Sequence, residues 1–216
     1  GKDSAQQMNV ELISSDINNN ILKFTLDGFY LVDVKDYKKI VKTNSGSSLL
    51  EKGNPDLQKI STSLIIPDDS KMDVRVISSN YTDYNDIDIV PSKGNINRSI
   101  NPESVPYHYS EVYEKDAFYP TELCKLRDSY IVRDLRGQSL IFMPFKYNPQ
   151  TKTLRVFNEI TVEVFSSGSS DNNIISRDDD IIKTSSEFNK IYSSHFINFN
   201  QDNRFEYLVD EGNLLI

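Results

Sequence analysis

Hydrophobic and polar residues alternate with a period of two along most of this chain. The alternation is clearest in residues 72–76, Met-Asp-Val-Arg-Val. Because successive side chains of a strand point to opposite faces, this pattern is typical of a strand with one face on a core and one in water. The pattern predicts strands at residues 9–15, 21–26, 29–34, 38–43, 61–66, 72–78, 86–90, 129–134, 139–146 and 153–165.

Turn residues separate these strands. Three asparagines, residues 18–20, lie between the first two, and Asn148-Pro149-Gln150-Thr151 lies between the last two. Asn and Pro favour tight turns, so we expect the last two strands to form an antiparallel hairpin.

Helix is scarce. Residues 110–115 are expected to form one turn. Residues 185–196 form the better helical pattern, in which Ser185 is the expected cap. Its apolar face would hold Phe188, Ile191, Tyr192 and Phe196. The Ser/Gly/Asn-rich residues 166–173 have the composition of a flexible linker. Together the elements predict an all-β fold, an antiparallel β-sandwich with a short C-terminal helix.

Composition narrows the possible partners. The 216-residue chain is 38% hydrophobic and carries 12 Tyr and 11 Phe, enough for a sizeable core. Its net charge of −8 argues against nucleic acid as a partner, because phosphate binding needs a basic surface. No apolar run approaches the roughly 18 residues that a membrane span requires, and we see no signal peptide.

Candidate catalytic and metal-binding residues are few. Cys124 is the single cysteine, and His108 and His195 are the two histidines that could activate it. Cys124 lies between apolar residues next to a predicted strand, so we expect it to pack in the core. Acidic groups at 178–180 and at Asp83, Asp86 and Asp88 could bind calcium, but lack EF-hand spacing and are usually solvated. We expect no metal and no cofactor.

The most distinctive segment is residues 91–107, which contains three prolines and one glycine. These residues exclude a helix and a central strand, so we expect an extended surface loop. Arg98 stands in its middle with no acidic residue within four positions on either side. A solvated arginine is the ordinary explanation, and insertion into an acidic pocket of another protein is the functional one.

Several long blocks, in the same order, resemble one known family. They are residues 90–107, 130–138 and 147–156, together with Glu51-Lys52-Gly53-Asn54-Pro55. This chain is similar, from about residue 10 onward, to the N-terminal propeptides of gingipain-type cysteine proteases, the C25 peptidases. The resemblance implies a β-sandwich of jelly-roll character. It also implies that the catalytic Cys and His belong to a domain following Ile216.

The resemblance also implies a mechanism. Arg98 matches the arginine that these propeptides place in the specificity pocket of an arginine-preferring protease. A guanidinium meets a pocket carboxylate as a charge-assisted pair. The flanking residues would run along the cleft and block substrate entry; they are Ile96, Asn97, Ser99 and Ile100. The implied partner is the cognate catalytic domain, bound in cis and then non-covalently, and the implied location is outside the cell or on its surface after export through the periplasm.

A second arginine is implied in processing. Gingipain-type propeptides end in an arginine, and the polar residues 199–205 contain Arg204 followed by Phe205. We expect this segment to be accessible to proteases. The implied division is a prodomain core at 1–166, a linker, helix and processing segment at 167–204, and a remnant of the catalytic domain at 205–216, whose first strand would begin near Leu214.

Two other functions stay open on the sequence. A secreted carbohydrate- or surface-binding module would use exposed aromatic rings such as Tyr107, Tyr109 and Tyr113, although the chain has no Trp. A folding chaperone or secretion partner would assist the protease without inhibiting it, and this role is compatible with inhibition in one propeptide.

Overall fold

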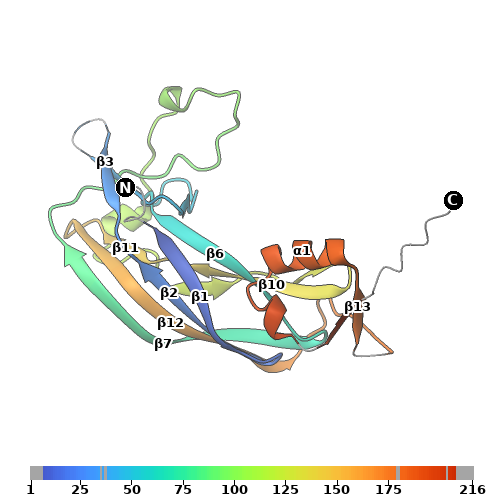
Figure 1. Ribbon diagram of the computed structural model, residues 1–216. Helices are drawn as coiled ribbons and strands as arrows, with labels where there is room; N and C mark the ends of the chain where they lie inside the picture. The colour runs from blue at the N-terminus through green and yellow to red at the C-terminus, as the bar shows by residue number, and fades with distance from the viewer. Residues whose placement is uncertain (1–6, 35, 37, 179–180, 203, 208–216) are drawn as a thin grey trace, which may run out of the picture.

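Two five-stranded antiparallel sheets pack face to face in the computed structural model (Figure 1). The structure describes residues 7–34, 36, 38–178, 181–202 and 204–207. The first sheet contains β1 (Met8–Ser15), β2 (Asn19–Leu26), β7 (Ser70–Tyr84), β11 (Phe145–Asn148) and β12 (Thr153–Ser169). The second contains β5 (Ser47–Ser48), β6 (Gln58–Ile65), β8 (Cys124–Leu126), β9 (Tyr130–Val132) and β10 (Leu135–Phe142).

The core lies between the two sheets. In β2 every second residue is buried, so Leu22, Phe24 and Leu26 point inward. The Phe24 ring stacks on Phe142 of β10, with ring centroids 5.5 Å apart, and this contact joins the two sheets. The alternation in the sequence therefore has the expected cause, and the predicted antiparallel β-sandwich is confirmed.

Strand β12 organises the first sheet. It pairs with β7 along one side and with β2 and β11 along the other. Its pairing with β11 across residues 149–152 is the antiparallel hairpin that the turn residues predict. Three register shifts interrupt the β7–β12 ladder, and such bulges increase the local twist.

The smaller elements lie around the sandwich. Strands β3 (Tyr30–Asp33) and β4 (Lys39–Lys42) form an antiparallel pair, and β13 (Ile182–Thr184) and β14 (Phe205–Tyr207) form a parallel one. Helix α1 (Ser186–His195) is accompanied by short 3-10 helices, among them η2 (Pro102–Ser104), η3 (Glu111–Glu114) and η4 (Phe199–Gln201).

Helix α1 packs against one end of the second sheet. Tyr192 and Phe196 are buried there, beside Ile65 of β6 and Leu135 of β10. Ile191, which the sequence placed on the same apolar face, is instead 50% exposed. Ser185 stands at the helix start as predicted, although its side chain makes no capping hydrogen bond.

Three local predictions are wrong. Residues 86–90 form no strand; they are an irregular segment in which the backbone of Lys39 bonds to Asp88 and Val90. Residues 139–146 are divided between β10 and β11. The supposed linker begins as strand, since β12 continues to Ser169. The composition of residues 166–169 was misleading, because serine also occurs at exposed positions of a strand.

Within the described residues, no helix is both long enough and apolar enough to cross a membrane.

Candidate inhibitory loop

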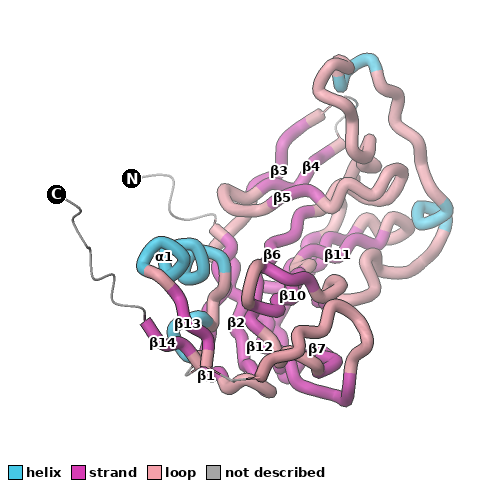
Figure 2. Tube along the Cα trace, turned by 90° about the vertical axis from the view of Figure 1, so that its right-hand side faces the viewer, coloured by secondary structure: helices cyan, strands magenta, loops and turns pink. Residues whose placement is uncertain are grey.

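A long loop projects from one end of the sandwich (Figures 1 and 2). Its two ends, at Ser92 and Ser110, are held by the same two residues, Gly53 and Asn54. The Ser92 amide donates to the Asn54 carbonyl (2.7 Å), and the Ser110 amide donates to the Gly53 carbonyl (3.0 Å). The Ser110 hydroxyl also binds the Asn54 side chain (2.7 Å). The two ends of the loop thus form a narrow neck, which these hydrogen bonds close. We call residues 93–109 the Arg98 loop.

Glycines allow the backbones to approach closely at this neck. Gly53 has φ +87°, and a Cβ atom there would lie 3.3 Å from Cβ of Ser110. Gly94 has φ +78°, and its Cβ would lie 3.0 Å from that of Lys52. Both positions have backbone conformations that residues with side chains rarely adopt. The family-like block around Gly53 thus forms the base of the loop.

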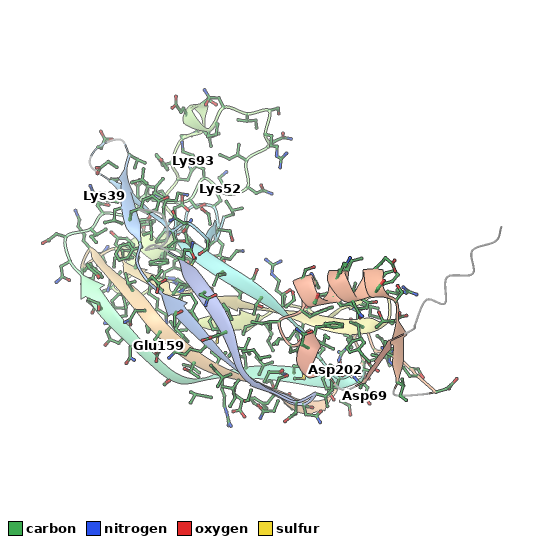
Figure 3. All side chains as sticks on the ribbon, viewed as in Figure 1. Lys39, Lys52, Asp69, Lys93, Glu159 and Asp202 are labelled. Atoms are coloured by element: carbon green, nitrogen blue, oxygen red, sulfur yellow. The ribbon has the colours of Figure 1, made fainter. Side chains whose placement is uncertain are left out.

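Lys93 connects the two limbs of the Arg98 loop. Its ammonium group donates to the Pro102 carbonyl (2.7 Å) and lies 4.4 Å from the centre of the Tyr107 ring. Figure 3 shows Lys93 close to Lys52 at the base of the loop. A cation that contacts both limbs limits how far they can separate.

The base of the loop is also packed by two tyrosines. Tyr109 and Tyr113 meet edge to face, 4.7 Å between ring centroids, and the Tyr113 hydroxyl donates to the Ile89 carbonyl (2.9 Å). Burial, and then the neighbouring Tyr147, raise the pKa of Tyr113 far above its usual range. Its ring and hydroxyl are therefore occupied within the fold, which disfavours the sugar-binding alternative.

The backbone around Arg98 forms a turn, and the prediction of extended backbone is wrong there. The Asn97 carbonyl accepts from the Ile100 amide (2.9 Å). The Asn97 side-chain oxygen accepts from the amide (3.0 Å) and the hydroxyl (3.1 Å) of Ser99. Arg98 is thus the second residue of a four-residue turn. Asn101 forms a similar cap at the start of η2, where its side chain accepts from the Glu103 amide.

The Arg98 side chain is exposed, and within the described residues its guanidinium forms no hydrogen bond or ion pair. The neighbouring residues Asn97, Ser99 and Ile100 are exposed as well, whereas Ile96 is half-buried. The turn therefore presents a free cation at the outer part of a closed loop.

Arg204 has the opposite environment. Its side chain is 18% exposed, and its guanidinium lies 2.9 Å from an Asp202 oxygen and 3.5 Å from an Asp68 oxygen. Its carbonyl accepts from the Ile182 amide (2.7 Å). Phe205 then begins β14, and its ring lies 4.6 Å from Phe199. The segment is therefore less accessible than the sequence predicted, because ion pairs, strand pairing and aromatic packing all hold it.

The two arginines are not brought together. Figures 1 and 2 show the Arg98 loop and α1 at opposite ends of the molecule. In Figure 3, Lys93 lies at the loop end and Asp202 lies at the other end, below α1. Residues 208–216, including the strand expected near Leu214, lie outside the described residues.

Comparison with known proteins shows the family. The family model Propeptide_C25 matches residues 3–206 of the chain. The chain belongs to this propeptide family. Gingipain R2 of Porphyromonas gingivalis (strain ATCC 33277) is 37% identical to this propeptide over 195 residues, 88% of the chain, and gingipain R1 of P. gingivalis is 36% identical over 181 residues, 82% of it. The propeptide spans only 26% and 18% of these relatives' lengths.

Solved structures agree with this assignment. A complex of the pro- and mature domains of P. gingivalis RgpB contains a chain with a TM-score of 0.80 and 35% identity; the alignment covers 88% of the propeptide and 97% of that chain. Gingipain K of P. gingivalis has the same fold, with a TM-score of 0.62 and 20% identity over 77% of the propeptide and 96% of that chain. The matched region is a propeptide domain of a cysteine protease and contains no catalytic domain.

Two of the residues considered for catalysis, Cys124 and His195, are engaged in the fold, whereas His108 is exposed. Cys124 is buried in β8, and burial, with a smaller effect of Glu122, raises the pKa of its thiol to about 11. His195 binds the Tyr130 hydroxyl (2.9 Å), and His108 lies on the Arg98 loop. Neither histidine forms a hydrogen bond with Cys124 in the described part of the chain. The expected packing role of Cys124 agrees with this geometry.

Two of the aspartates considered for calcium, Asp83 and Asp88, form ion pairs within the fold. Arg155 holds Asp83 through two 2.8 Å bonds, and Lys152 lies 3.2 Å from Asp88. No group of three acidic, His or Cys residues in the described segments could hold a metal ion. Asp179 and Asp180 lie outside the described residues.

One buried arginine could not be predicted from the sequence. Arg136 is only 1% exposed, and its guanidinium donates to backbone carbonyls and hydroxyls; among the described residues, no carboxylate forms an ion pair with it. The acceptors are the carbonyls of Pro67, Ser70, Asn172 and Asn173 and the hydroxyls of Ser129 and Ser170. These groups come from segments far apart in sequence, so no local pattern could reveal them.

Proposed function

We propose that this propeptide keeps a C25 cysteine protease latent by placing Arg98 in the S1 pocket of the protease. The Arg98 loop then blocks the active-site cleft as a competitive inhibitor. The observation that supports this proposal most directly is the unpaired, exposed guanidinium at the end of a closed loop. Family membership supplies the class of the partner.

The environments of the other arginines set Arg98 apart, with one exception. Arg127 is also exposed and forms no ion pair within the described residues, but it follows β8 and does not lie on the projecting loop. Carboxylates lie within ion-pair distance of Arg75, Arg133, Arg155, Arg177 and Arg204. Backbone carbonyls satisfy Arg136. An arginine without such a partner can offer its full set of donors to another protein, and a pocket carboxylate accepts two of them in parallel. The proposed partner therefore has an acidic S1 pocket and prefers arginine.

The scaffold also favours tight binding. The neck at Gly53 and Asn54 and the cross-link through Lys93 restrict the loop before it binds. Less conformational entropy is then lost on association than with a free peptide. The chain that matches this propeptide in the RgpB structure belongs to a complex of pro- and mature domains, which is the arrangement that we propose here.

Replacing Arg98 tests the proposal. Removing one member of a buried charge pair costs about 2–5 kcal/mol, so Arg98→Ala should raise the inhibition constant about 30- to 4,000-fold. The measurement is inhibition of the catalytic domain by the isolated, folded propeptide. Arg127→Ala, which removes another exposed arginine, is the matched control and should inhibit as the parent does. Unchanged inhibition by Arg98→Ala would contradict the proposal.

We further propose that cleavage between Arg204 and Phe205 releases the protease. Arg204 must first leave Asp202 and Asp68, because a protease needs its side chain and its carbonyl group, which Ile182 binds. One S1 pocket cannot hold two arginines, so this cut requires that Arg98 has left the cleft or that a second protease molecule acts. Sequencing the N-terminus of the released protease tests the position, with Phe205 as the expected first residue.

We also propose that the propeptide assists the folding of the protease and is exported together with it. A propeptide that binds the native catalytic domain stabilises it by mass action. The yield of active protease should therefore be higher when the catalytic domain is refolded with the propeptide than without it. Equal yields would leave inhibition as the single proposed role.

A further inference from the structure

The bond between Arg204 and Phe205 lies at the start of β14, within a folded part of the molecule. Strand β14 pairs in parallel with β13, and Phe205 is the partner of Ile182 in this ladder. Figure 2 shows the two strands next to α1. Cleavage at this bond would leave β13 on the propeptide and β14 on the protease. The two strands of one small sheet would then belong to two separate molecules.

We propose that β13 and the aromatic residues beside it form a binding site for the N-terminus of the released protease. The occupant is the segment Phe205-Glu206-Tyr207, which stays paired with β13 after the cut. The inference rests on the proposed function, because only a cut before Phe205 gives the protease this N-terminus. The site adds a second contact between propeptide and protease, at the end of the sandwich opposite the Arg98 loop (Figure 1).

The side chain of Phe205 packs in an aromatic cluster. Its ring centroid lies 4.6 Å from that of Phe199 and 6.3 Å from that of Tyr192. Phe199 and Tyr192 are buried, together with Ile182 of β13. All three residues stay on the propeptide after the cut. Withdrawal of the Phe205 ring would return apolar surface to water, which is unfavourable.

Bonds to the second sheet anchor this cluster independently of β14. The side-chain oxygen of Asn198 accepts from the Ile65 amide (2.8 Å), and its side-chain nitrogen donates to the Ile65 carbonyl (2.9 Å). The Ile197 amide donates to the Ser63 carbonyl (2.9 Å). These bonds to β6 fix the residues directly before Phe199. The site therefore does not depend on β14 for its shape, and a preformed site loses little entropy on binding.

The edge of β13 binds the backbone of the segment. A peptide that adds to the edge of a sheet is held by main-chain hydrogen bonds, and pockets for its side chains supply specificity. Here the Ile182 amide donates to the Arg204 carbonyl (2.7 Å). Hydrolysis breaks the bond between the Arg204 carbonyl carbon and the Phe205 nitrogen, and water supplies a hydroxyl to the new carboxyl group and a proton to the new amine. The Ile182 amide then has a carboxylate as its acceptor, which forms a stronger hydrogen bond.

Two contacts with one partner reinforce each other. While the Arg98 loop occupies the cleft, the N-terminus of the same protease molecule stays near β13. Its rebinding is then intramolecular, at a raised effective concentration. The site therefore slows the release of the propeptide after the cut and prolongs latency.

The experiment uses the processed complex of propeptide and protease, isolated after complete cleavage of the zymogen by added active protease. The zymogens are the parent and the F205S, F205Y and I191S variants. The rate of dissociation is measured after dilution, from the recovery of protease activity, and N-terminal sequencing of the protease identifies the cut. Active-site titration of the released protease checks that each catalytic domain is intact.

We expect the F205S complex to dissociate about tenfold faster than the parent complex, since burial of a phenylalanine ring is worth about this factor or more. F205Y keeps an aromatic ring and should dissociate at the parental rate. I191S removes an exposed apolar side chain from α1, outside the site, and should also behave as the parent does.

The outcomes separate the two proposals. A protease that begins at a residue other than Phe205 would overturn the proposed cleavage position, and the inference with it. If the protease begins at Phe205 but F205S dissociates at the parental rate, the segment leaves β13 after the cut; the inference is then overturned and the proposed function stands. Equal acceleration by F205S and either F205Y or I191S would also overturn the inference, because the effect would not depend on the ring in this site.

Discussion

Arg98 and Arg204 are both arginines in polar segments, but their guanidinium groups lie in opposite environments. Arg98 is exposed with no intramolecular partner in the described residues, and Arg204 is bound by Asp202 and Asp68. Sequence distance explains part of the difference, because Asp202 is only two residues from Arg204. Asp68 lies 136 positions away and could not be foreseen.

The environment of Cys124 predicts low reactivity. Burial raises the pKa of its thiol to about 11, so about one molecule in a thousand is a thiolate at pH 8. Alkylation by iodoacetamide should therefore be at least about 100-fold slower in the folded propeptide than in denaturant, and should accelerate as the pH rises towards 11. Rapid alkylation at pH 8 would mean that Cys124 is accessible and contradict its place in the core.

At the scale of elements, charged contacts hold the C-terminal segment to the sandwich, in addition to the packing of Tyr192 and Phe196 on the second sheet. Asp68 follows β6 and binds both Arg177 (2.6 Å) and Arg204 (3.5 Å). These two arginines lie on either side of α1 in the sequence. Asp68 therefore connects the segments on both sides of α1 to the sandwich, beside the hydrogen bonds that Asn198 makes with Ile65.

Removing Asp68 should therefore expose the processing arginine. Asp68→Ala deletes a hydrogen bond to the charged Arg177, worth about 1.5–3 kcal/mol, and the ion pair with Arg204, and should raise the rate of cleavage after Arg204 about tenfold. The measurement is the rate of appearance of the N-terminus at Phe205 in the presence of a fixed amount of active protease.

The neighbouring exposed Asp69 provides the control. Asp69→Ala changes the same charge in the same turn but contacts neither arginine, so processing should proceed at the parental rate. Equal rates for all three proteins would show that opening of the segment does not limit the cut.

At the scale of the whole molecule, Arg136 joins the two sheets at one edge. It lies on β10 of the second sheet and binds the carbonyl of Ser70, the first residue of β7 in the first sheet. It also binds the carbonyls of Asn172 and Asn173, which follow β12. The segment of linker composition is ordered for this reason.

Loss of Arg136 should destabilise the propeptide strongly. Arg136→Met leaves several buried carbonyls without a donor, each at a cost of about 1–3 kcal/mol, so the free energy of unfolding should fall by more than about 3 kcal/mol. Urea denaturation measures this. Arg75→Met removes an arginine that is 67% exposed and ion-paired with Glu163, and should cost less than about 1 kcal/mol. Similar losses for both variants would contradict the role of Arg136.

The distance between the Arg98 loop and the processing segment matters for activation. The loop that is proposed to inhibit and the segment that is proposed to be cut lie at opposite ends of the sandwich (Figure 1). The contacts that hold the processing segment can therefore be altered by Asp68→Ala without changing those of the Arg98 loop, whereas Arg98→Ala should affect both inhibition and any processing that needs a vacant cleft.

Local rules account for much of the fold. The alternation in β2, the turn before β12 and the helical spacing of Tyr192 and Phe196 depend on neighbours in sequence, so their positions could be predicted. The loop and its exposed Arg98 follow in the same way from three prolines and a local lack of acidic residues. The turn itself uses Asn97, a common turn residue whose role the prolines obscured.

Other features depend on groups distant in the chain. The neck of the Arg98 loop requires Gly53 and Asn54, the order of the supposed linker requires Arg136, and the engagement of Arg204 requires Asp68. The sequence by itself thus determined the β-sandwich, the propeptide family and the free cation at Arg98. Only the tertiary structure decided that the loop is closed and Arg204 held, because hydrogen bonds and ion pairs between remote segments exist only once the sheets have packed.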